Sequence, residues 1–265
     1  MIRRRRTPLG SLTYWLVVAI LLIGGIVMVF PLFWLVSTSL RPAPELLLVP
    51  PRLLPEQWTI ANFQKVFDQA PMLTYLWNSL VFATISTVFI LLTSATAGYI
   101  FAKFKFPGNN FLFMLVIATA IVPFEIYMVP LFLPFLVLSY GIFFMRQNTI
   151  AGVPNELLDA ARIDGMSELR IMLQLVPRLL APAMAALSIL AFIQAWTAFI
   201  WPLLILNNPK YYPMELGLSQ FANSSSVDFG MVAAGAVIAM LPALIAFLIL
   251  RRRIVEGITL TGLKG

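Results

Sequence analysis

The feature that most constrains this chain is a series of long apolar runs separated by short polar segments. The runs extend from about Leu12 to Leu40, Leu73 to Phe101, Leu179 to Leu206 and Phe229 to Leu250. About 20 apolar residues suffice for a helix to cross a bilayer. Hydrophobic residues make up 60% of the chain and charged residues 11%, a balance that excludes an ordinary soluble domain. We therefore predict an all-α polytopic membrane protein with a single transmembrane domain over residues 1–265.

Clusters of positive charge flank these runs and predict their orientation. The clusters are Arg3 to Arg6 before the first run, Lys103 and Lys105 after the second, and Arg251 to Arg253 after the last. Lys and Arg accumulate on the cytoplasmic side of membrane proteins, so both termini are predicted to be cytoplasmic. The charges of the loop 41–72 are balanced, which suits the extracytoplasmic side. Orientation thus accounts for the net charge of +7 better than nucleic-acid binding does.

The apolar region from Phe111 to Met145 has to cross the membrane twice if the segments on both sides of it are cytoplasmic. Two spanning helices need about 20 residues each and a connection, and the region has 35 residues. Either both helices are unusually brief, or a loop is missing from the sequence near Leu133, between Phe132 and Pro134. We favour the missing loop. Counting this double crossing, the chain has about six transmembrane helices.

The composition also excludes several kinds of chemistry. The chain has no cysteine and no histidine, which removes thiol nucleophiles, imidazole bases and the commonest metal ligands. The apolar runs contain no Lys and no paired Asp, so an intramembrane enzyme is disfavoured. No G-x-x-x-x-G-K-[ST] motif occurs, and ATP hydrolysis would therefore need another subunit. We predict no catalytic residue, no metal site and no cofactor in this chain.

A polar segment from Pro154 to Pro177 interrupts the apolar pattern between the fourth and fifth predicted spans. Its charged residues are Glu156, Asp159, Arg162, Asp164, Glu168 and Arg170. Ionisable groups are costly inside a bilayer, so the segment must lie outside the membrane core. The orientation of the flanking spans places it in the cytoplasm.

The same segment predicts two short helices around a glycine turn. Pro154 suits a helix start, because its missing N–H is not needed there. Leu157, Leu158 and Ala161 then form one apolar stripe. Gly165 can end the first helix in the left-handed conformation, and Ser167 can cap the second. Pro177 and Pro182 then interrupt the helical pattern.

The stretch DAARIDG, Asp159 to Gly165, resembles the cytoplasmic "EAA" loop of binding-protein-dependent ABC importer permeases. The family pattern is Glu-Ala-Ala, three residues, Gly, nine residues and then Ile-x-Leu-Pro. Three further blocks resemble the carbohydrate-uptake, maltose-permease-like branch: Gly141 to Gln147, AFIQAWTAFIWPL from Ala191 to Leu203, and VEGITLTGLKG from Val255 to Gly265. The departures are Asp159 in place of Glu, Pro177 one residue early, and the stretch missing near Leu133, where relatives have a longer outward loop.

The resemblance implies a type I ABC importer permease fold in which the segment 154–177 contains a coupling helix. It implies that this loop docks on a dimer of cytoplasmic ATP-binding subunits, which hold the ATP and magnesium. The docking residues carried over are Glu156, Asp159, Ala160, Ala161, Arg162, Asp164 and Gly165. The tail 251–265 either reaches toward the ATPase subunits or is a frayed end.

The resemblance also implies a bacterial or archaeal cytoplasmic membrane, a second homologous permease subunit and an extracytoplasmic solute-binding protein. The expected solute is a sugar or related polyhydroxylated compound, with glycerol-3-phosphate or another non-sugar solute as the alternative. A channel or a secondary transporter is less well supported, because neither would need the charged docking loop.

Four polar or aromatic residues within or near the spans are candidates for the substrate pathway: Asn78, Gln194, Trp196 and Thr197. Amides can pair with sugar hydroxyls and aromatic rings can stack on sugar faces, while polar groups in a membrane usually face the protein interior or a cavity. A structural role is the favoured alternative for each. Glu125 lies either near the outer mouth or in an internal pair.

Overall fold

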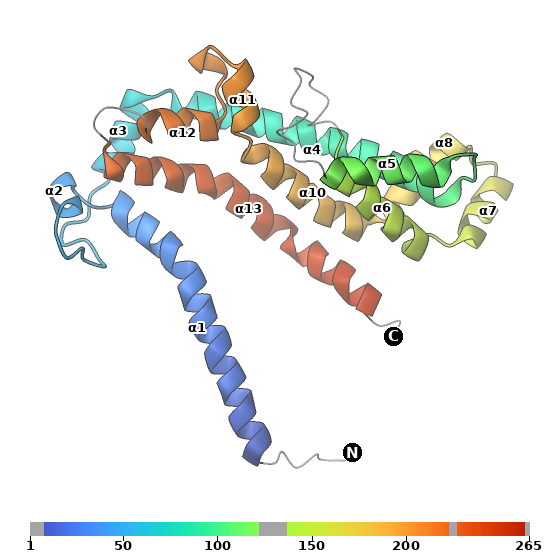
Figure 1. The fold of residues 1–265 in the computed structure, drawn as a ribbon, viewed down its shortest axis with the longest axis horizontal. Coiled ribbons are helices and arrows are strands. Elements are labelled where there is room, and N and C mark those ends of the chain that lie inside the picture. The colour runs from blue at the N-terminus through green and yellow to red at the C-terminus, as the bar shows by residue number, and fades with distance from the viewer. Residues whose placement is uncertain (1–7, 122–136, 223–226, 263–265) are drawn as a thin grey trace. The chain divides into compact units, whose positions relative to one another are not determined.

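The protein is entirely helical in the part that the computed structural model describes, residues 8–121, 137–222 and 227–262. In chain order the elements are α1 (Pro8–Ser39), α2 (Ala43–Leu46), α3 (Ala61–Gln69), α4 (Met72–Lys103), α5 (Asn109–Ile121), α6 (Ser139–Gly152), α7 (Asn155–Ile163), α8 (Glu168–Arg170), the π-helix η3 (Ile171–Leu175), α9 (Val176–Leu179), α10 (Ala181–Trp196), α11 (Ile200–Ile205), the 3₁₀-helix η4 (Pro209–Tyr211), α12 (Met214–Ala222) and α13 (Phe229–Gly262) (Figure 1). This is the all-α class that the sequence predicts.

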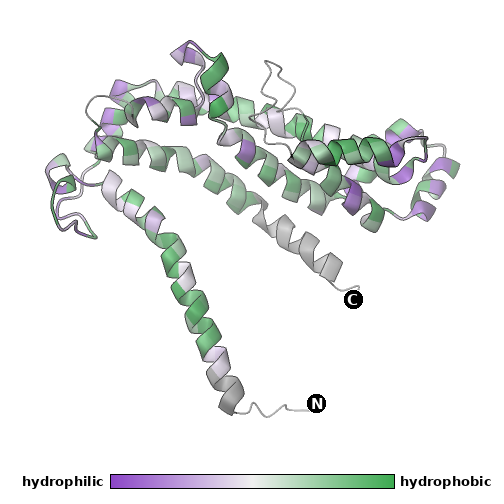
Figure 2. Cartoon of the chain, viewed as in Figure 1, coloured by the Kyte–Doolittle hydropathy of each residue, from purple (hydrophilic) through white to green (hydrophobic). Residues whose placement is uncertain are grey.

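Four stretches of the described helices are long and apolar enough to cross a membrane. They are Thr13–Ser39, Met72–Lys103, Ala181–Ile205 and Phe229–Ile249, which correspond to the four long runs of the sequence. The shorter helices α5 and α6 lie in the region that was predicted to cross twice. Figure 2 shows hydrophobic residues along the middle of α1 and along α5, and hydrophilic residues on α7.

Some expectations fall outside the described residues. They concern the N-terminal cluster Arg3 to Arg6, the position of Glu125, and the loop missing near Leu133. Of the predicted tail 251–265, the structure describes the backbone as far as Gly262, and this backbone continues α13 as a helix. The tail therefore begins as a helical extension of the last span, well past its predicted end at Leu250.

The predicted fifth span is not one continuous helix. It divides into α10, which ends at Trp196, and α11, which begins at Ile200. Pro202 explains the interruption, because a proline cannot donate a hydrogen bond to the carbonyl four residues earlier and its ring clashes with that carbonyl. The helix therefore ends before Ala198, the residue whose carbonyl Pro202 would meet, and starts again beyond it.

One compact unit comprises residues 1–70 and 218–238. Within it, Asn62 on α3 fixes the chain that leaves α1, since its amide Nδ2 donates to the carbonyls of Ser39 (2.9 Å) and Arg41 (2.7 Å). Lys65 Nζ lies 2.8 Å from Asp228 Oδ2, and Asp228 also accepts from a backbone N–H at the start of α13. Polar contacts therefore tie the predicted extracytoplasmic loop to this unit.

The second compact unit comprises residues 71–217 and 239–265, and α4 packs there against α6 and α10 (Figure 1). Small residues bring α4 and α6 together. A Cβ added at Gly98 would lie 2.7 Å from the Cβ of Met145, and one at Gly141 would overlap the hydroxyl of Ser94. Small residues at helix contacts allow the close backbone approach on which packing in membranes depends.

A single apolar core joins these helices to the polar segment. Its most buried side chains include Tyr99, Met145, Leu158, Ile171 and Leu187, each at most 1% exposed. They come in turn from α4, α6, α7, η3 and α10. The polar segment is therefore built into the core of its unit by its apolar face, and only its other face is solvated.

Candidate functional site

The first helix of the polar segment, α7, forms where the sequence predicts it. Pro154 occupies the N-cap position with extended backbone (φ −64°, ψ 141°). Leu158 (1% exposed) and Ala161 (8%) face the core, as predicted for the apolar stripe. Leu157 is 39% exposed, so its assignment to the buried stripe is wrong. It lies about 100° around the helix from Leu158, and α7 buries a narrower face than the sequence predicted.

The turn after α7 is a Schellman motif centred on Gly165. Gly165 has φ +81°, a conformation that glycine adopts without strain. Its N–H donates to the carbonyl of Arg162 (3.0 Å), and the N–H of Met166 donates to that of Ala161 (2.9 Å), which is the bonding pattern of this motif. Ser167 Oγ then accepts from the N–H of Arg170 (3.4 Å) and caps α8. The predicted glycine turn and serine cap are both present.

Arg162 bridges the two short helices across this turn. Its Nη1 lies 2.7 Å from Asp159 Oδ1, and its Nε lies 2.5 Å from Glu168 Oε1. The hydrogen bond from Arg162 lowers the pKa of the Glu168 carboxyl, and the two carboxylates raise the pKa of the guanidinium. Asp159 and Arg162, expected to make contacts with a partner, are thus already paired within the loop. Exposed pairs of this kind contribute little stability, and here they add to the backbone hydrogen bonds of the Gly165 turn.

The other residues predicted for docking lie on the outer surface of the loop, except Ala161 in the core. Glu156, Ala160, Asp164 and Gly165 are exposed. The sequence-based prediction missed Ile163, the last residue of α7, which is 86% exposed. A single exposed apolar side chain is common on a protein surface, but this one lies among the charged residues that were predicted for docking. The sequence could have indicated this exposure, because Ile163 lies off the apolar stripe of α7.

The loop is anchored to the C-terminal part of α4 by two polar side chains whose contacts the sequence did not reveal. The hydroxyl of Tyr99 donates to Glu168 Oε2 (3.3 Å). Lys103 Nζ donates to the carbonyl of Val153 (2.6 Å) and to Asn155 Oδ1 (2.8 Å), at the start of α7. Both helices of the loop are therefore connected to the same membrane-length helix.

A π-helical turn carries the chain from α8 back toward the membrane. Pro177 has no N–H to donate to the carbonyl of Leu173, and its ring would crowd that carbonyl in a regular α-helix. The turn η3 relieves the conflict by widening, with the N–H of Val176 bonded to the carbonyl of Ile171, five residues back. This is the structural outcome of the early proline noted in the sequence.

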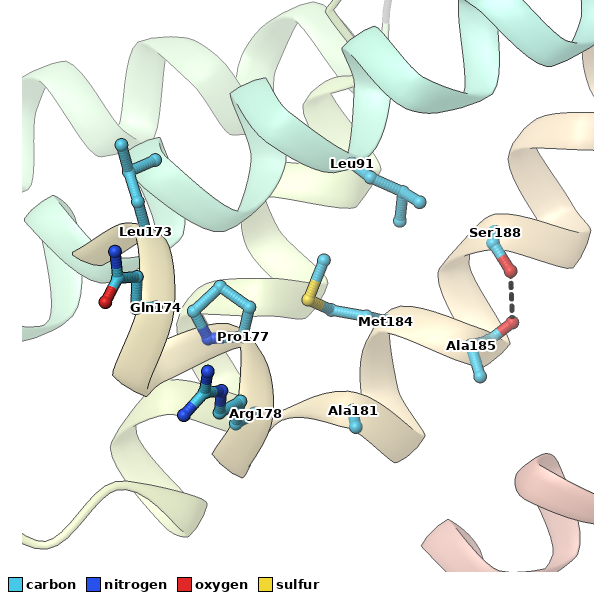
Figure 3. Close-up of a pocket in the computed structure, with 9 residues that line it drawn as sticks. All are labelled: Leu91, Leu173, Gln174, Pro177, Arg178, Ala181, Met184, Ala185 and Ser188. Carbon is cyan, nitrogen blue, oxygen red and sulfur yellow. Dashed lines mark hydrogen bonds between the residues drawn. The ribbon is translucent and has the colours of Figure 1, made fainter. Parts of the chain in front are cut away.

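A cavity of about 500 Å³ lies beside this turn (Figure 3). Its lining comes from α4, η3, α9 and α10: Leu91, Leu173, Gln174, Pro177, Arg178, Ala181, Met184, Ala185 and Ser188. The Ser188 hydroxyl is bonded to the carbonyl of Ala185 (2.7 Å), which leaves Gln174 and Arg178 as the polar side chains at the cavity. Across the described part of the chain, no cluster of acidic side chains could hold a metal ion.

The candidates for the substrate pathway do not form one cluster. Asn78 Nδ2 donates to the carbonyls of Lys210 (2.9 Å) and Tyr212 (3.0 Å). Trp196 is 1% exposed. Its indole N–H donates to a backbone carbonyl of α13 (3.0 Å). These are the structural roles given above as the alternative. Gln194 and Thr197 are exposed at the end of α10, where the helix breaks, although the Thr197 hydroxyl bonds its own helix.

Comparison with known proteins decides the family. Residues 94–258, which contain the polar segment and the helices around it, match the family described as "Binding-protein-dependent transport system inner membrane component". The chain belongs to this family. It is therefore the permease subunit of an ABC importer in the inner membrane, a transport component and not an enzyme.

Two relatives of this importer permease resemble it over almost their whole length. The arabinooligosaccharides transport system permease protein AraQ of Halalkalibacterium halodurans is 33% identical, covering 99% of this chain and 100% of the relative. The protein of the same name from Bacillus subtilis is 34% identical, covering 89% and 90%. The first alignment spans 282 positions, more than the 265 residues of this chain, so that relative contains residues with no counterpart here.

A solved structure confirms the fold of the permease. The match is to a bacterial ABC transporter involved in the import of the acidic polysaccharide alginate, with a TM-score of 0.82 and 18% sequence identity. It covers 94% of this chain and 99% of the other. The predicted fold class, an all-α membrane protein with the ABC importer permease fold, is thus confirmed, while at this identity the likeness concerns the fold alone.

Proposed function

We propose that this permease forms the translocation pathway for an oligosaccharide and is driven through α7 and α8 by a separate ATPase. The observation that carries the proposal is the construction of the loop. Leu158 and Ala161 anchor it in the core, Arg162 locks its two helices together, and Ile163 is displayed on the outside. A short pair of helices that is held together internally and exposes an apolar residue is suited to move as one unit when a partner binds it.

The proposed coupling works through rigid-body movement. ATP-driven closure of two ATPase subunits would displace α7 and α8 as one piece, because the Gly165 turn and the ion pairs of Arg162 resist bending between them. Tyr99 and Lys103 would then pass the displacement to α4. Packed helices respond to such a shift by changing between discrete arrangements, here inward-open and outward-open states.

The proposed assembly contains four kinds of subunit. The ATPase dimer supplies ATP and magnesium, a second and homologous permease completes the pathway, and an extracytoplasmic binding protein delivers the solute. Family membership supports the ATPase and the binding protein. In the apolar stretch of α1, Thr13–Ser39, the described residues bury none of the most hydropathic window, which leaves its surface available to lipid or to the second permease. The proposed orientation has both termini in the cytoplasm.

An oligosaccharide is the proposed solute because two relatives that cover most of this chain bear names that specify arabinooligosaccharides. Glycerol-3-phosphate is the alternative to be tested against it. In a strain that lacks this permease, uptake of labelled arabinooligosaccharide should fall to background and return with the wild-type chain. Loss of glycerol-3-phosphate uptake in place of sugar uptake would reject the sugar assignment and leave the coupling mechanism untouched.

The coupling itself is tested with a pair of matched substitutions. Ile163→Asp places a charge at the most exposed apolar position of α7, and Leu47→Asp does the same at a residue that is 78% exposed in the predicted extracytoplasmic loop. We expect Ile163→Asp to abolish co-purification with the ATPase subunit and ATP-dependent uptake while membrane levels stay normal. Leu47→Asp should retain the ATPase subunit. Equal effects of the two substitutions, or uptake that persists without ATP binding, would refute the proposal.

A further inference from the structure

A second cavity, of about 400 Å³, lies where α4 passes into α5. The end of α4, the connecting turn, the first turn of α5 and one side chain of α6 form it. Its lining residues are aromatic, basic or amide-bearing apart from Ala102 and Gly108: Phe101, Phe104, Lys105, Phe106, Asn109, Asn110, Phe111 and Arg146. No acidic residue lines it, so the cavity is basic.

The two cations of this cavity are not neutralised. Among the residues that the structure describes, neither Lys105 nor Arg146 is in an ion pair. Arg146 is held in place by other means, because its Nε donates to the carbonyl of Phe101 (3.2 Å) and its guanidinium carbon lies 4.1 Å from the ring centre of Phe113. Two Nη atoms of a fixed guanidinium and an exposed ammonium group therefore remain for an anion. A guanidinium fork is well matched to phosphate oxygens.

The position of the cavity relative to the apolar spans places it at the membrane surface. The span on α4 ends at Lys103 and the apolar helix α5 begins at Asn109, so the connection between them lies at the level of the lipid headgroups. Along α5, large apolar side chains are exposed close to the cavity: Phe111 by 66%, Leu112 by 45% and Met114 by 68%. A ligand with an anionic head and apolar tails fits both features, whereas free phosphate would use only the first.

We propose that this cavity, the α4–α5 pocket, binds the phosphodiester headgroup of an anionic phospholipid. Lys105 and Arg146 hold the phosphate, the Asn110 amide contacts the glycerol region, and the acyl chains lie on the exposed face of α5. Basic pockets between transmembrane helices on the cytoplasmic side are suited to such headgroups. The site is separate from the coupling loop and does not depend on which solute the permease carries.

Lipid retention by the purified full-length chain tests this assignment. The probe is a mixture of phosphatidylglycerol and phosphatidylcholine, and bound lipid is counted by native mass spectrometry. We expect the wild-type chain to retain phosphatidylglycerol preferentially. Lys105→Gln should weaken that retention about fivefold, the effect of removing one basic residue close to an anionic lipid surface. Lys105 makes no hydrogen bond or ion pair among the described residues, so its replacement should not unfold the chain.

Two further arms complete the test. Lys210→Gln removes one positive charge in η4, away from the α4–α5 pocket, and should leave lipid retention unchanged. Arg146→Lys keeps the positive charge but loses the two-pronged guanidinium group, and it should weaken lipid retention. Equal retention of both lipids by the wild type, equal effects of Lys105→Gln and Lys210→Gln, or displacement of the lipid by inorganic phosphate would overturn the proposal. Unchanged lipid retention with weaker ATPase binding in Lys105→Gln would also overturn it, by making the pocket a protein interface.

Discussion

Substitutions of Gly165 test two requirements of the proposed docking separately: the left-handed backbone conformation of the turn and the absence of a side chain on its surface. With φ at +81°, any L-residue other than glycine is strained by about 1–2 kcal/mol there. A Cβ at this position would meet no atom within 4 Å, so the strain is the whole local cost. Gly165→Ala should therefore weaken ATPase binding by about 5–30-fold at most, and Gly165→Asn by less, because Asn tolerates this conformation.

Gly165→Trp adds bulk to the strain. Its ring would project into the open space in front of the turn, where the partner is proposed to sit, and a side chain of about 150–250 Å² cannot be accommodated in a close contact. We expect the chain to insert normally, with co-purification of the ATPase subunit and ATP-dependent uptake both lost. The assay compares membrane level, co-purification and uptake across the three variants. Normal uptake in Gly165→Trp would refute the docking role of this turn.

Three further substitutions follow from contacts in the second unit. The pKa of Glu168 is lowered in the folded loop, so the contribution of its ion pair is present above the ordinary Glu pKa and is lost as the pH falls through the lowered value. Hydrogen exchange of the loop amides should thus remain slow to about pH 4 in the wild type, and Glu168→Gln should remove this acid transition. Trp196→Phe removes the buried hydrogen bond from the indole N–H to the carbonyl of Ala239 and should cost about 1 kcal/mol, seen as a lower Tm in detergent that the exposed control Trp15→Phe does not show. Lys103→Met should lower the ratio of solute transported to ATP hydrolysed while the ATPase subunit stays bound, and an unchanged ratio would contradict its place in transmission.

Apolar run length, the charged residues of the polar segment and the glycine turn were sufficient to predict the membrane class, the long spans and the two helices of the polar segment. Each of these depends on local chemistry: burial of a run, the cost of a charge in lipid, and the freedom of Gly165 at positive φ. The sequence did not reveal that Tyr99 and Lys103 hold the loop, since these contacts join residues 69 and 50 positions apart in the chain. The ion pairs of Arg162 are local, with Asp159 three residues before it and Glu168 six residues after it, but Asp159 and Arg162 had both been assigned to contacts with a partner. Ile163 was missed because it falls at one of the three unspecified positions of the family pattern, between Ala161 and Gly165.

The interruption of the fifth span and the π-helical turn could have been predicted more closely. Both have the same cause, a proline inside a helical stretch, at Pro202 and at Pro177. The positions of the prolines showed where the helices would be irregular. Whether a helix ended, as before Pro202, or formed a π-helical turn, as before Pro177, depended on the residues packed around it. The cavity beside η3 and the α4–α5 pocket arise from three-dimensional packing between several helices, for which a single sequence carries no direct signal.

The helix α4 connects the two ends of its unit without a break. At one end its Asn78 holds the backbone after η4, and at the other its Lys103 holds the start of the coupling loop. At about 1.5 Å per residue these two positions are about 38 Å apart. A continuous helix resists bending, so a tilt of about 5° at the loop displaces the far end by about 3 Å. Under the proposed coupling, α4 would therefore act as a lever, and its length would set how far its other end moves for a given tilt at the loop.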